Sequence, residues 1–252
     1  MKAKDVVLMP QEINLLKMLG ENQGYYDCPK DGSGKRTGKL VGYAGKYETA
    51  PGSGEFKHYV GERYWNFPRG AERNPEVLEQ FVKDVFYDSC YDESMSGEIN
   101  CAFGCPEGGI LPAYEIAKRF ECYFSRADKK VIEVATPERR EKSELVFGRH
   151  TVEPGWGVAI VEDVVNNLST TDKAIKLIES RGATVQAIIC MINRSPEGLT
   201  VWEYEGREIP IIAAVLIPTL EYRQDDPYVA ADVEAGNVVW KPKDNWNELI
   251  VA

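Results

Sequence analysis

Residues 157–182 read GVAIVEDVVNNLSTTDKAIKLIESRG, and this stretch decides the fold. Residues 158–161 form an unbroken apolar run rich in β-branched side chains, which is typical of a strand buried on both faces. Two carboxylates, Glu162 and Asp163, follow directly. Carboxylates beside a buried strand suit the hydroxyl groups of a sugar, or a metal held by a polyphosphate. An ordinary polar exit from a sheet is the competing interpretation of this pair.

A polar loop over residues 166–171 leads from the acidic pair into an amphipathic helix. Every loop residue except Leu168 carries a hydroxyl or an amide. Thr170 or Thr171 is a good N-cap for the helix, and Gly182 closes it. Because N–H groups at a helix start favour an anion, the unit predicts a phosphate site.

The composition narrows the function classes. The chain has 252 residues, 43% of them hydrophobic, and a formal net charge of −10. An acidic chain is poorly suited to sequence-independent nucleic-acid binding, so we expect no nucleic-acid partner. No apolar run is long enough to cross a bilayer, and the N-terminus does not read as a signal peptide. We therefore expect a cytoplasmic protein without a membrane partner.

The cysteines support the same compartment. Of the six, several lie in apolar segments, where a thiol packs as a small hydrophobic group. Without a secretion signal we expect them to be reduced. The two histidines, His58 and His150, lie far along the chain from Cys101 and Cys105, which argues against a zinc site.

Two regions differ in pattern. We assign residues 1–75 to an N-terminal hood that is small and β-rich, because its middle is rich in glycine and aromatic residues. It starts with a short amphipathic helix whose expected core residues are Ile13, Leu15, Leu16 and Leu19. Residues 76–252 form the core domain with a C-terminal tail.

The core domain alternates strands and helices. Expected helices cover residues 74–86, with Val77, Leu78, Phe81, Val82 and Val85 on the apolar side, and residues 110–120. Expected strands cover 99–103, 130–135, 158–161, 187–192 and 209–217. This alternation predicts an α/β fold, a central mostly parallel sheet flanked by helices. Ligands of such sheets bind beyond the carboxyl ends of the strands.

Three further segments gather at that edge, each with an ordinary alternative. The GCPEGG loop over 104–109 offers backbone N–H groups for a pyrophosphate, or it is a plain turn. The charged segment 136–152 is long for a connection and suits a lid over an anion, or it is a solvated loop. Arg194, just past a strand, is placed to clamp a carboxylate, or it is a surface arginine.

Taken together, these motifs resemble the type I phosphoribosyltransferases, and within them the orotate phosphoribosyltransferases. VAIVEDVVNNLST (158–170) is similar to their motif for 5-phosphoribosyl-1-pyrophosphate (PRPP). CAFGCPEGGILPAYEIAKRF (101–120) resembles their pyrophosphate loop and helix, and CMINRSPEG (190–198) their strand ending in an orotate-binding arginine. ELVFGRHTVEPGWGVAIVEDV (144–164) resembles the return from their catalytic loop.

The resemblance implies transfer of ribose 5-phosphate from PRPP to orotate, giving orotidine 5′-monophosphate and pyrophosphate. It implies Mg²⁺ bound mainly through PRPP, with a possible contribution from Asp163. The implied catalytic residues are Glu162, Asp163, Arg139, Arg140 and Lys142. The implied PRPP-binding residues are Glu107, Gly108, Gly109, Glu162, Asp163, Val164, Val165, Asn166, Asn167, Leu168, Ser169, Thr170 and Thr171. The implied orotate-binding residues are Asn166, Arg194 and Lys57.

The chain departs from the family pattern at two places. Asn166-Asn167-Leu168-Ser169 stands where the family has Thr-Thr-Gly-Gly, and we expect Leu168 not to adopt the positive φ that glycine permits. Glu107 and Gly108 stand where many members carry a lysine. A non-catalytic PRPP-binding regulatory protein and a transferase for another nucleobase therefore stay open. The family also implies a homodimer with shared active sites, in which segment 136–152 reaches the neighbouring subunit.

Overall fold

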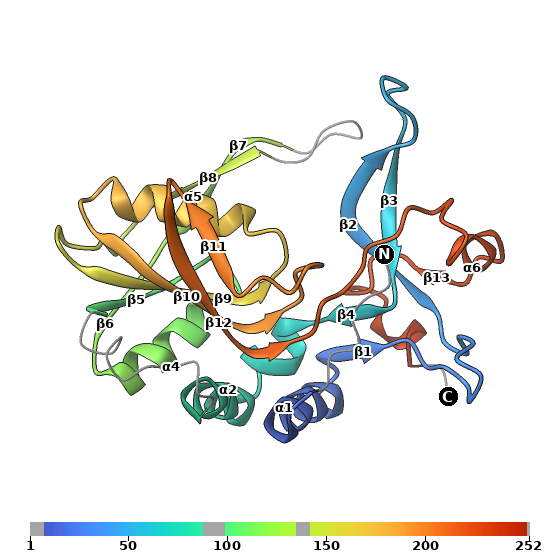
Figure 1. Ribbon diagram of the computed structural model, residues 1–252, viewed down its shortest axis with the longest axis horizontal. Helices are drawn as coiled ribbons and strands as arrows, with labels where there is room; N and C mark the ends of the chain where they lie inside the picture. The colour runs from blue at the N-terminus through green and yellow to red at the C-terminus, as the bar shows by residue number, and fades with distance from the viewer. Residues whose placement is uncertain (1–7, 88–98, 135–141, 251–252) are drawn as a thin grey trace.

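The computed structural model describes residues 8–87, 99–134 and 142–250. A six-stranded sheet lies at the centre of its larger lobe (Figure 1). The strand order is β11 (Val201–Tyr204), β12 (Arg207–Leu216), β10 (Thr184–Asn193), β9 (Gly157–Val165), β5 (Cys101–Gly104) and β6 (Tyr123–Arg126). All neighbours are parallel except β11, which pairs antiparallel with β12. The predicted mostly parallel α/β sheet is confirmed.

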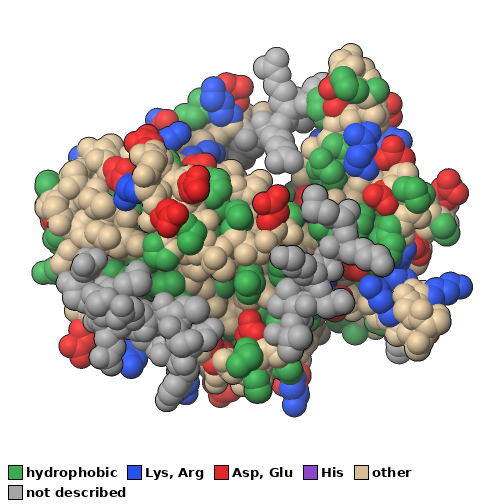
Figure 2. All heavy atoms as spheres, in the orientation of Figure 1, with side chains coloured by type: hydrophobic (Ala, Val, Ile, Leu, Met, Phe, Trp, Pro, Cys, Tyr) green, Lys and Arg blue, Asp and Glu red, His purple; other side chains and the backbone are tan. Residues whose placement is uncertain are grey.

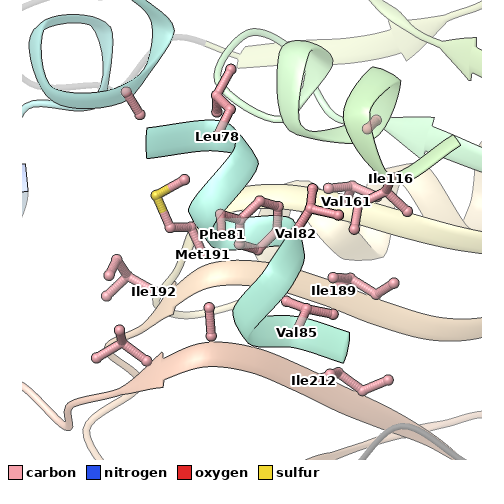
Figure 3. Close-up of a cluster of buried hydrophobic side chains, with 14 of the residues drawn as sticks. Leu78, Phe81, Val82, Val85, Ile116, Val161, Ile189, Met191, Ile192 and Ile212 are labelled. Carbon is pink, nitrogen blue, oxygen red and sulfur yellow. The ribbon is translucent and has the colours of Figure 1, made fainter. Parts of the chain in front are cut away.

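Helices cover both faces of this sheet. Three of them, α1 (Pro10–Glu21), α2 (Pro75–Tyr87) and α4 (Ile110–Phe120), lie against one face, and α5 (Ser169–Glu179) lies against the other (Figure 1). Figure 3 shows α2 pressing Phe81, Val82 and Val85 onto side chains of the strands, among them Val161 and Ile189. The five predicted apolar residues of α2 are all buried.

One predicted core residue of α1 is wrong. Leu15, Leu16 and Leu19 are buried, but Ile13 is 54% exposed. A helix turns about 100° per residue, so Ile13 lies on a different side from the stripe formed by the three leucines.

The predicted core strand over 130–135 is also wrong. This part of the chain forms β7 (Asp128–Glu133), which does not join the central sheet. β7 pairs with β8 (Lys142–Val146) in a separate antiparallel hairpin. Val131 and Ile132 of β7 are 47% and 46% exposed. The sheet edge is instead taken by β6, and β11 was not predicted. Charged residues on both sides of a two-residue apolar run fit a solvated hairpin better than a buried strand.

A smaller, β-rich lobe contains the N-terminal strands. β2 (Leu40–Glu48) and β3 (Phe56–Gly61) form a hairpin, and β13 (Val238–Val239) pairs parallel with β2. β1 (Tyr25–Asp27) pairs with β4 (Arg63–Trp65). Two short helical segments complete it, α6 (Ala230–Glu234) and η2 (Trp246–Glu248). Another, η1 (Pro68–Glu72), packs instead against α1 and α2, and its Ala71 belongs to the core of the larger lobe. The C-terminal segment thus contributes to the sheet of the N-terminal region, while the boundary at residue 75 stays a prediction.

The surface in Figure 2 carries acidic and basic side chains mixed together, without an extended basic patch among the described residues on that face. No helix within the described ranges has both the length and the apolar character needed to span a membrane. The described cysteines, which exclude Cys90, are free thiols.

Candidate active site

The acidic pair lies inside β9, not after it. β9 continues to Val165, so Glu162 and Asp163 are its sixth and seventh residues. β9 is a central strand, flanked by β5 and β10, and its side chains are therefore surrounded by protein. Glu162 is buried, and Asp163 is part-buried at the edge of a cavity.

Burial sets the protonation of this pair. Burial, and secondarily the charge of Asp163, raise the pKa of Glu162 to about 8. Burial raises the pKa of Asp163 to about 6, although the backbone N–H of Val164, 2.7 Å from Oδ1, lowers it. Burial thus favours the protonated form of both carboxyl groups, more strongly for Glu162 than for Asp163.

The loop over 104–109 packs tightly on the carboxyl end of β9. The N–H of Cys105 donates to the carbonyl of Val161 at 3.0 Å. A Cβ atom at Gly108 would collide with the carboxylate of Asp163, and one at Gly109 with the carbonyl of Val161. Glycine is thus required at Gly109 for the loop to approach β9, whereas a side chain at Gly108 would have to displace the Asp163 carboxylate.

A cavity of about 410 Å³ opens between this loop and the smaller lobe. It includes three predicted site residues, Glu107, Gly108 and Asp163. Sequence reasoning missed the others, which are Pro68, Glu72, Ile110, Leu111 and Lys243. Lys243 is the basic residue among the described residues that line this cavity. It lies far along the chain from the other lining residues, so the sequence did not indicate that it would be here. The cavity can admit an anionic group that carries its own cation.

The loop before α5 differs from our expectation. α5 begins at Ser169, so neither Thr170 nor Thr171 is the N-cap. Leu168 precedes it with φ +57°, the left-handed conformation that we expected this residue to avoid. Its side chain is 3% exposed, and burial in the core offsets the backbone cost.

The other residues of this loop divide into accessible and buried ones. Asn167 and Ser169 are exposed, and Oδ1 of Asn167 accepts the N–H of Ser169 at 3.2 Å. Thr170, Asn166 and Val164 are part-buried, whereas Val165 and Thr171 are buried. The side chain of Thr171, 1% exposed, is turned away from solvent.

Asn166 and Arg194 lie side by side. Val165 of β9 pairs with Asn193 of β10, so each residue is one position past the paired end of its strand. Nη2 of Arg194 donates to Oε1 of Glu221 at 3.0 Å, and Nδ2 of Asn166 donates to the same oxygen at 3.1 Å. Glu221, missed by sequence reasoning, links two of the three predicted orotate-binding residues.

Aromatic rings enclose the arginine. The guanidinium carbon of Arg194 lies 4.8 Å from the ring centre of Tyr43 and 5.6 Å from that of Trp65. Arg194 is 9% exposed, and its Nε is buried without a hydrogen-bond partner among the described residues. The surface alternative for this arginine is therefore wrong.

Two of the remaining predicted cations, Lys57 and Lys142, do not line the cavity. Lys57 lies in β3, exposed, opposite Tyr47 of β2. Lys142 opens β8 and forms an exposed ion pair with Glu133, with 3.3 Å between Nζ and Oε1. Arg139 and Arg140 lie outside the described residues.

The comparisons place this geometry in a known fold. The structure matches the crystal structure of orotate phosphoribosyltransferase from Aeropyrum pernix with a TM-score of 0.50 and 15% identity, over 80% of this chain and 92% of that one. The chain has the fold of the type I phosphoribosyltransferases. No family model matches the sequence.

Among named proteins, the chain is similar to orotate phosphoribosyltransferases. It is 31% identical to the one from Carboxydothermus hydrogenoformans over 123 residues, which are 48% of this chain and 56% of that protein. It is 26% identical to the one from Nitratiruptor sp. over 168 residues, 66% of this chain and 74% of that protein. The chain spans little more than half the length of the first two relatives that it matches. The resemblance drawn from the motifs is confirmed.

Proposed function

We propose that the chain is an orotate phosphoribosyltransferase, which transfers ribose 5-phosphate from PRPP to N1 of orotate. The observation that carries the proposal is that three features lie at one edge of the sheet: the acidic pair in the C-terminal half of β9, the glycine loop after β5 and Arg194 after β10. That edge is where parallel α/β sheets bind their ligands. The similarity to named orotate phosphoribosyltransferases supports the choice of base.

The reaction breaks the bond between ribose and pyrophosphate. Positive charge develops on the ribose and negative charge on the leaving group, so placed charges and aligned substrates accelerate it without a covalent nucleophile. In our proposal Asp163 and Glu162 hold the ribose hydroxyls, with Asp163 accepting a hydrogen bond at the edge of the cavity. The backbone at Gly108 and Gly109 holds pyrophosphate, and the loop before α5 holds the 5-phosphate.

The residues fit a magnesium ion that arrives with PRPP. The described residues contain no group of three or more His, Cys, Asp and Glu side chains that could hold a metal ion, and in our proposal the ion is bound mainly through PRPP. Asp163 offers the hard carboxylate oxygen that Mg²⁺ prefers, beside the cavity. When bound, Mg²⁺ would neutralise charge on the pyrophosphate. Asp163 would orient the ribose beside it.

We also propose that Arg139, Arg140 and Lys142 close over the pyrophosphate, and that they come from the neighbouring subunit of a cytoplasmic homodimer. β7 and β8, which border this segment, project from the sheet as a hairpin (Figure 1). Both substrates are anionic, so a local group of cations on an acidic protein would favour their binding. Lys57 is the further candidate near the base.

A second candidate is a phosphoribosyltransferase for another nucleobase. It is favoured by the contact of Glu221 with Arg194, because this carboxylate already balances the charge that orotate would meet.

The test is the change in orotate absorbance on mixing protein, PRPP, Mg²⁺ and orotate. Adenine, guanine, hypoxanthine and uracil are assayed in parallel, and pyrophosphate release is measured for each. We expect turnover of orotate that disappears when Mg²⁺ is chelated. Turnover of another base alone would establish the second candidate. PRPP binding by calorimetry without any turnover would indicate a non-catalytic binding protein.

A further inference from the structure

The carboxylate of Glu221 binds the guanidinium of Arg194, which is the group proposed to bind a substrate carboxylate. Its Oε1 accepts hydrogen bonds from Arg194 and Asn166, at 3.0 and 3.1 Å. A substrate acid that used the same donors would meet a negative charge already in place. Two carboxylates that need the same Nη2 donor repel each other, so a substrate acid that pairs with this edge has to displace Glu221.

The backbone that carries Glu221 is fixed on both sides. Before it, the N–H of Thr219 donates to the carbonyl of Arg194 at 3.2 Å. After it, Tyr222 exchanges two backbone hydrogen bonds with Val60 of β3, at 2.8 and 3.0 Å. The segment therefore holds Glu221 against Arg194, while its side chain, 22% exposed, keeps a route to solvent.

Glu221 uses only part of the donor edge of Arg194. Nε–H and Nη2 lie along one edge of a planar guanidinium, and a carboxylate can accept from both. Glu221 accepts from Nη2 with an oxygen that it shares with Asn166, and the buried Nε has no partner among the described residues. The unpaired Nε–H is an independent sign that this edge suits a bidentate carboxylate in place of Glu221.

We propose that Glu221 is a competing internal carboxylate that limits the affinity of the base site for an acid group, an inference that rests on the proposed function. A base with an acid group displaces Glu221 by pairing with both Nε–H and Nη2. A neutral base offers no equivalent charge, so it leaves the Arg194–Glu221 pair closed. Glu221 therefore neutralises Arg194 while the site is empty, and an acidic base binds less tightly because it has to break this pair.

The experiment compares wild type with Glu221→Gln, which keeps the shape and removes the charge. Binding of orotate and of uracil is measured by calorimetry, without PRPP. We expect Glu221→Gln to bind orotate about tenfold more tightly, since the competing charge is gone, and to leave uracil binding unchanged, since uracil does not have to break the pair. We also expect the melting temperature of the free variant to fall, because Arg194 loses its counter-charge, and orotate to restore more of it than in wild type.

A matched control is Asp225→Asn, on the same segment. Asp225 is 73% exposed at its side chain and pairs with Arg223 at the surface, so its loss changes the net charge equally without touching Arg194. We expect unchanged orotate binding. Glu221→Ala provides a second variant, because a glutamine side chain can still accept a hydrogen bond from Arg194 and alanine cannot. We expect Glu221→Ala to bind orotate more tightly than wild type as well.

The outcomes separate the two proposals. Orotate turnover by wild type, together with equal or weaker orotate binding by both Glu221 variants, would overturn the competitor and leave the enzyme intact. Tighter orotate binding by the variants, without turnover by any of the proteins, would support the role of Glu221 as a competitor and contradict the proposed function. Failure of wild type and variants alike to bind orotate would overturn both.

Discussion

Arg194 is a cation held almost out of water, and this decides what its removal does. Its charge is balanced by Glu221 and its faces are covered by Tyr43 and Trp65. Because a charged hydrogen bond contributes about 1.5–3 kcal/mol, we expect Arg194→Ala to weaken orotate by roughly 10- to 150-fold. Binding of PRPP should change far less. Calorimetric titration with each ligand provides the measurement.

The control for this prediction is Arg223→Ala, which removes a more exposed cation stacked on Tyr47. Equal losses of orotate and PRPP binding in Arg194→Ala, or a general loss of folding, would show that the arginine is structural.

Asp163 lines the cavity, and its carboxylate lies against Gly108 of the glycine loop. Replacing it by asparagine keeps the shape and removes the charge that would stabilise the ribose. We expect Asp163→Asn to lower kcat by about 100-fold or more with an unchanged melting temperature or a higher one. Steady-state assays and thermal unfolding test this. The control is Glu153→Gln, a change at an exposed residue shortly before β9. Near-normal rates in Asp163→Asn would mean that the acidic pair has only a structural role in the sheet.

At the scale of elements, the start of α5 depends on a leucine in an unusual conformation. Leu168→Gly would relieve the positive φ but remove a side chain that is 3% exposed. Relief contributes about 1–2 kcal/mol, whereas truncating a buried leucine to alanine costs about 3–5 kcal/mol. We therefore expect Leu168→Gly to lower the free energy of unfolding by about 2–4 kcal/mol, since glycine also loses more backbone entropy.

Denaturant unfolding measures this change. Lys241 also has a positive φ, +50°, but is exposed, so Lys241→Gly should leave stability within about 1 kcal/mol of wild type or raise it. A Leu168→Gly protein as stable as wild type would contradict the role of burial.

Helix α2 carries a carboxylate on its buried side. Asp84 is 3% exposed, its Oδ1 accepts from Nε2 of Gln80 at 2.6 Å, and burial raises its pKa to about 6. A folded-state pKa above the unfolded value of about 3.9 means that the folded protein binds the proton more tightly. Stability from this group is present below about pH 4 and is lost as pH rises through 6.

Asp84→Asn should therefore stabilise the protein at pH 8, by on the order of 1–3 kcal/mol, and have little effect at pH 4. Thermal unfolding at pH 4, 6 and 8 provides the test. Glu79→Gln, an exposed change on the same helix, should be nearly neutral at each pH. A constant effect of Asp84→Asn across this range would exclude titration as the cause.

Local patterns account for the elements that sequence could predict. The apolar spacing in α2 and the β-branched run in β9 are decided by neighbours in the chain, and these elements are found where expected. Arg194 could be located because a strand end fixes its position. Glu221 and Lys243 could not, since each reaches the site through a crossing between the two lobes that no local pattern encodes. The prediction of a core strand at β7 was wrong because a short apolar run does not reveal whether a sheet lies beside it.

At the scale of the whole molecule, the charged segment 136–152 raises the question of assembly. Its described part includes Lys142, whose side chain is exposed and paired only with Glu133 among the described residues. We predict a two-fold homodimer in which this segment serves the partner's site. Arg140→Ala/Lys142→Ala and Asp163→Asn should each be nearly inactive alone.

Mixed in equal amounts and allowed to exchange subunits, these two proteins should recover roughly a quarter of wild-type activity, because half the dimers would then hold one intact site. Native mass spectrometry would verify that mixed dimers form. Mixed dimers without recovered activity would show that the segment acts on its own subunit.

The pairing of β13 with β2 also has a consequence for synthesis on the ribosome. Val238 pairs with Leu40, so about 200 residues must be made between the two partners of one small sheet. The larger sheet, whose strands all lie between them, has its whole sequence available earlier. A nascent chain can therefore complete its larger lobe while β2 and β3 still lack their third strand, and the smaller lobe closes last.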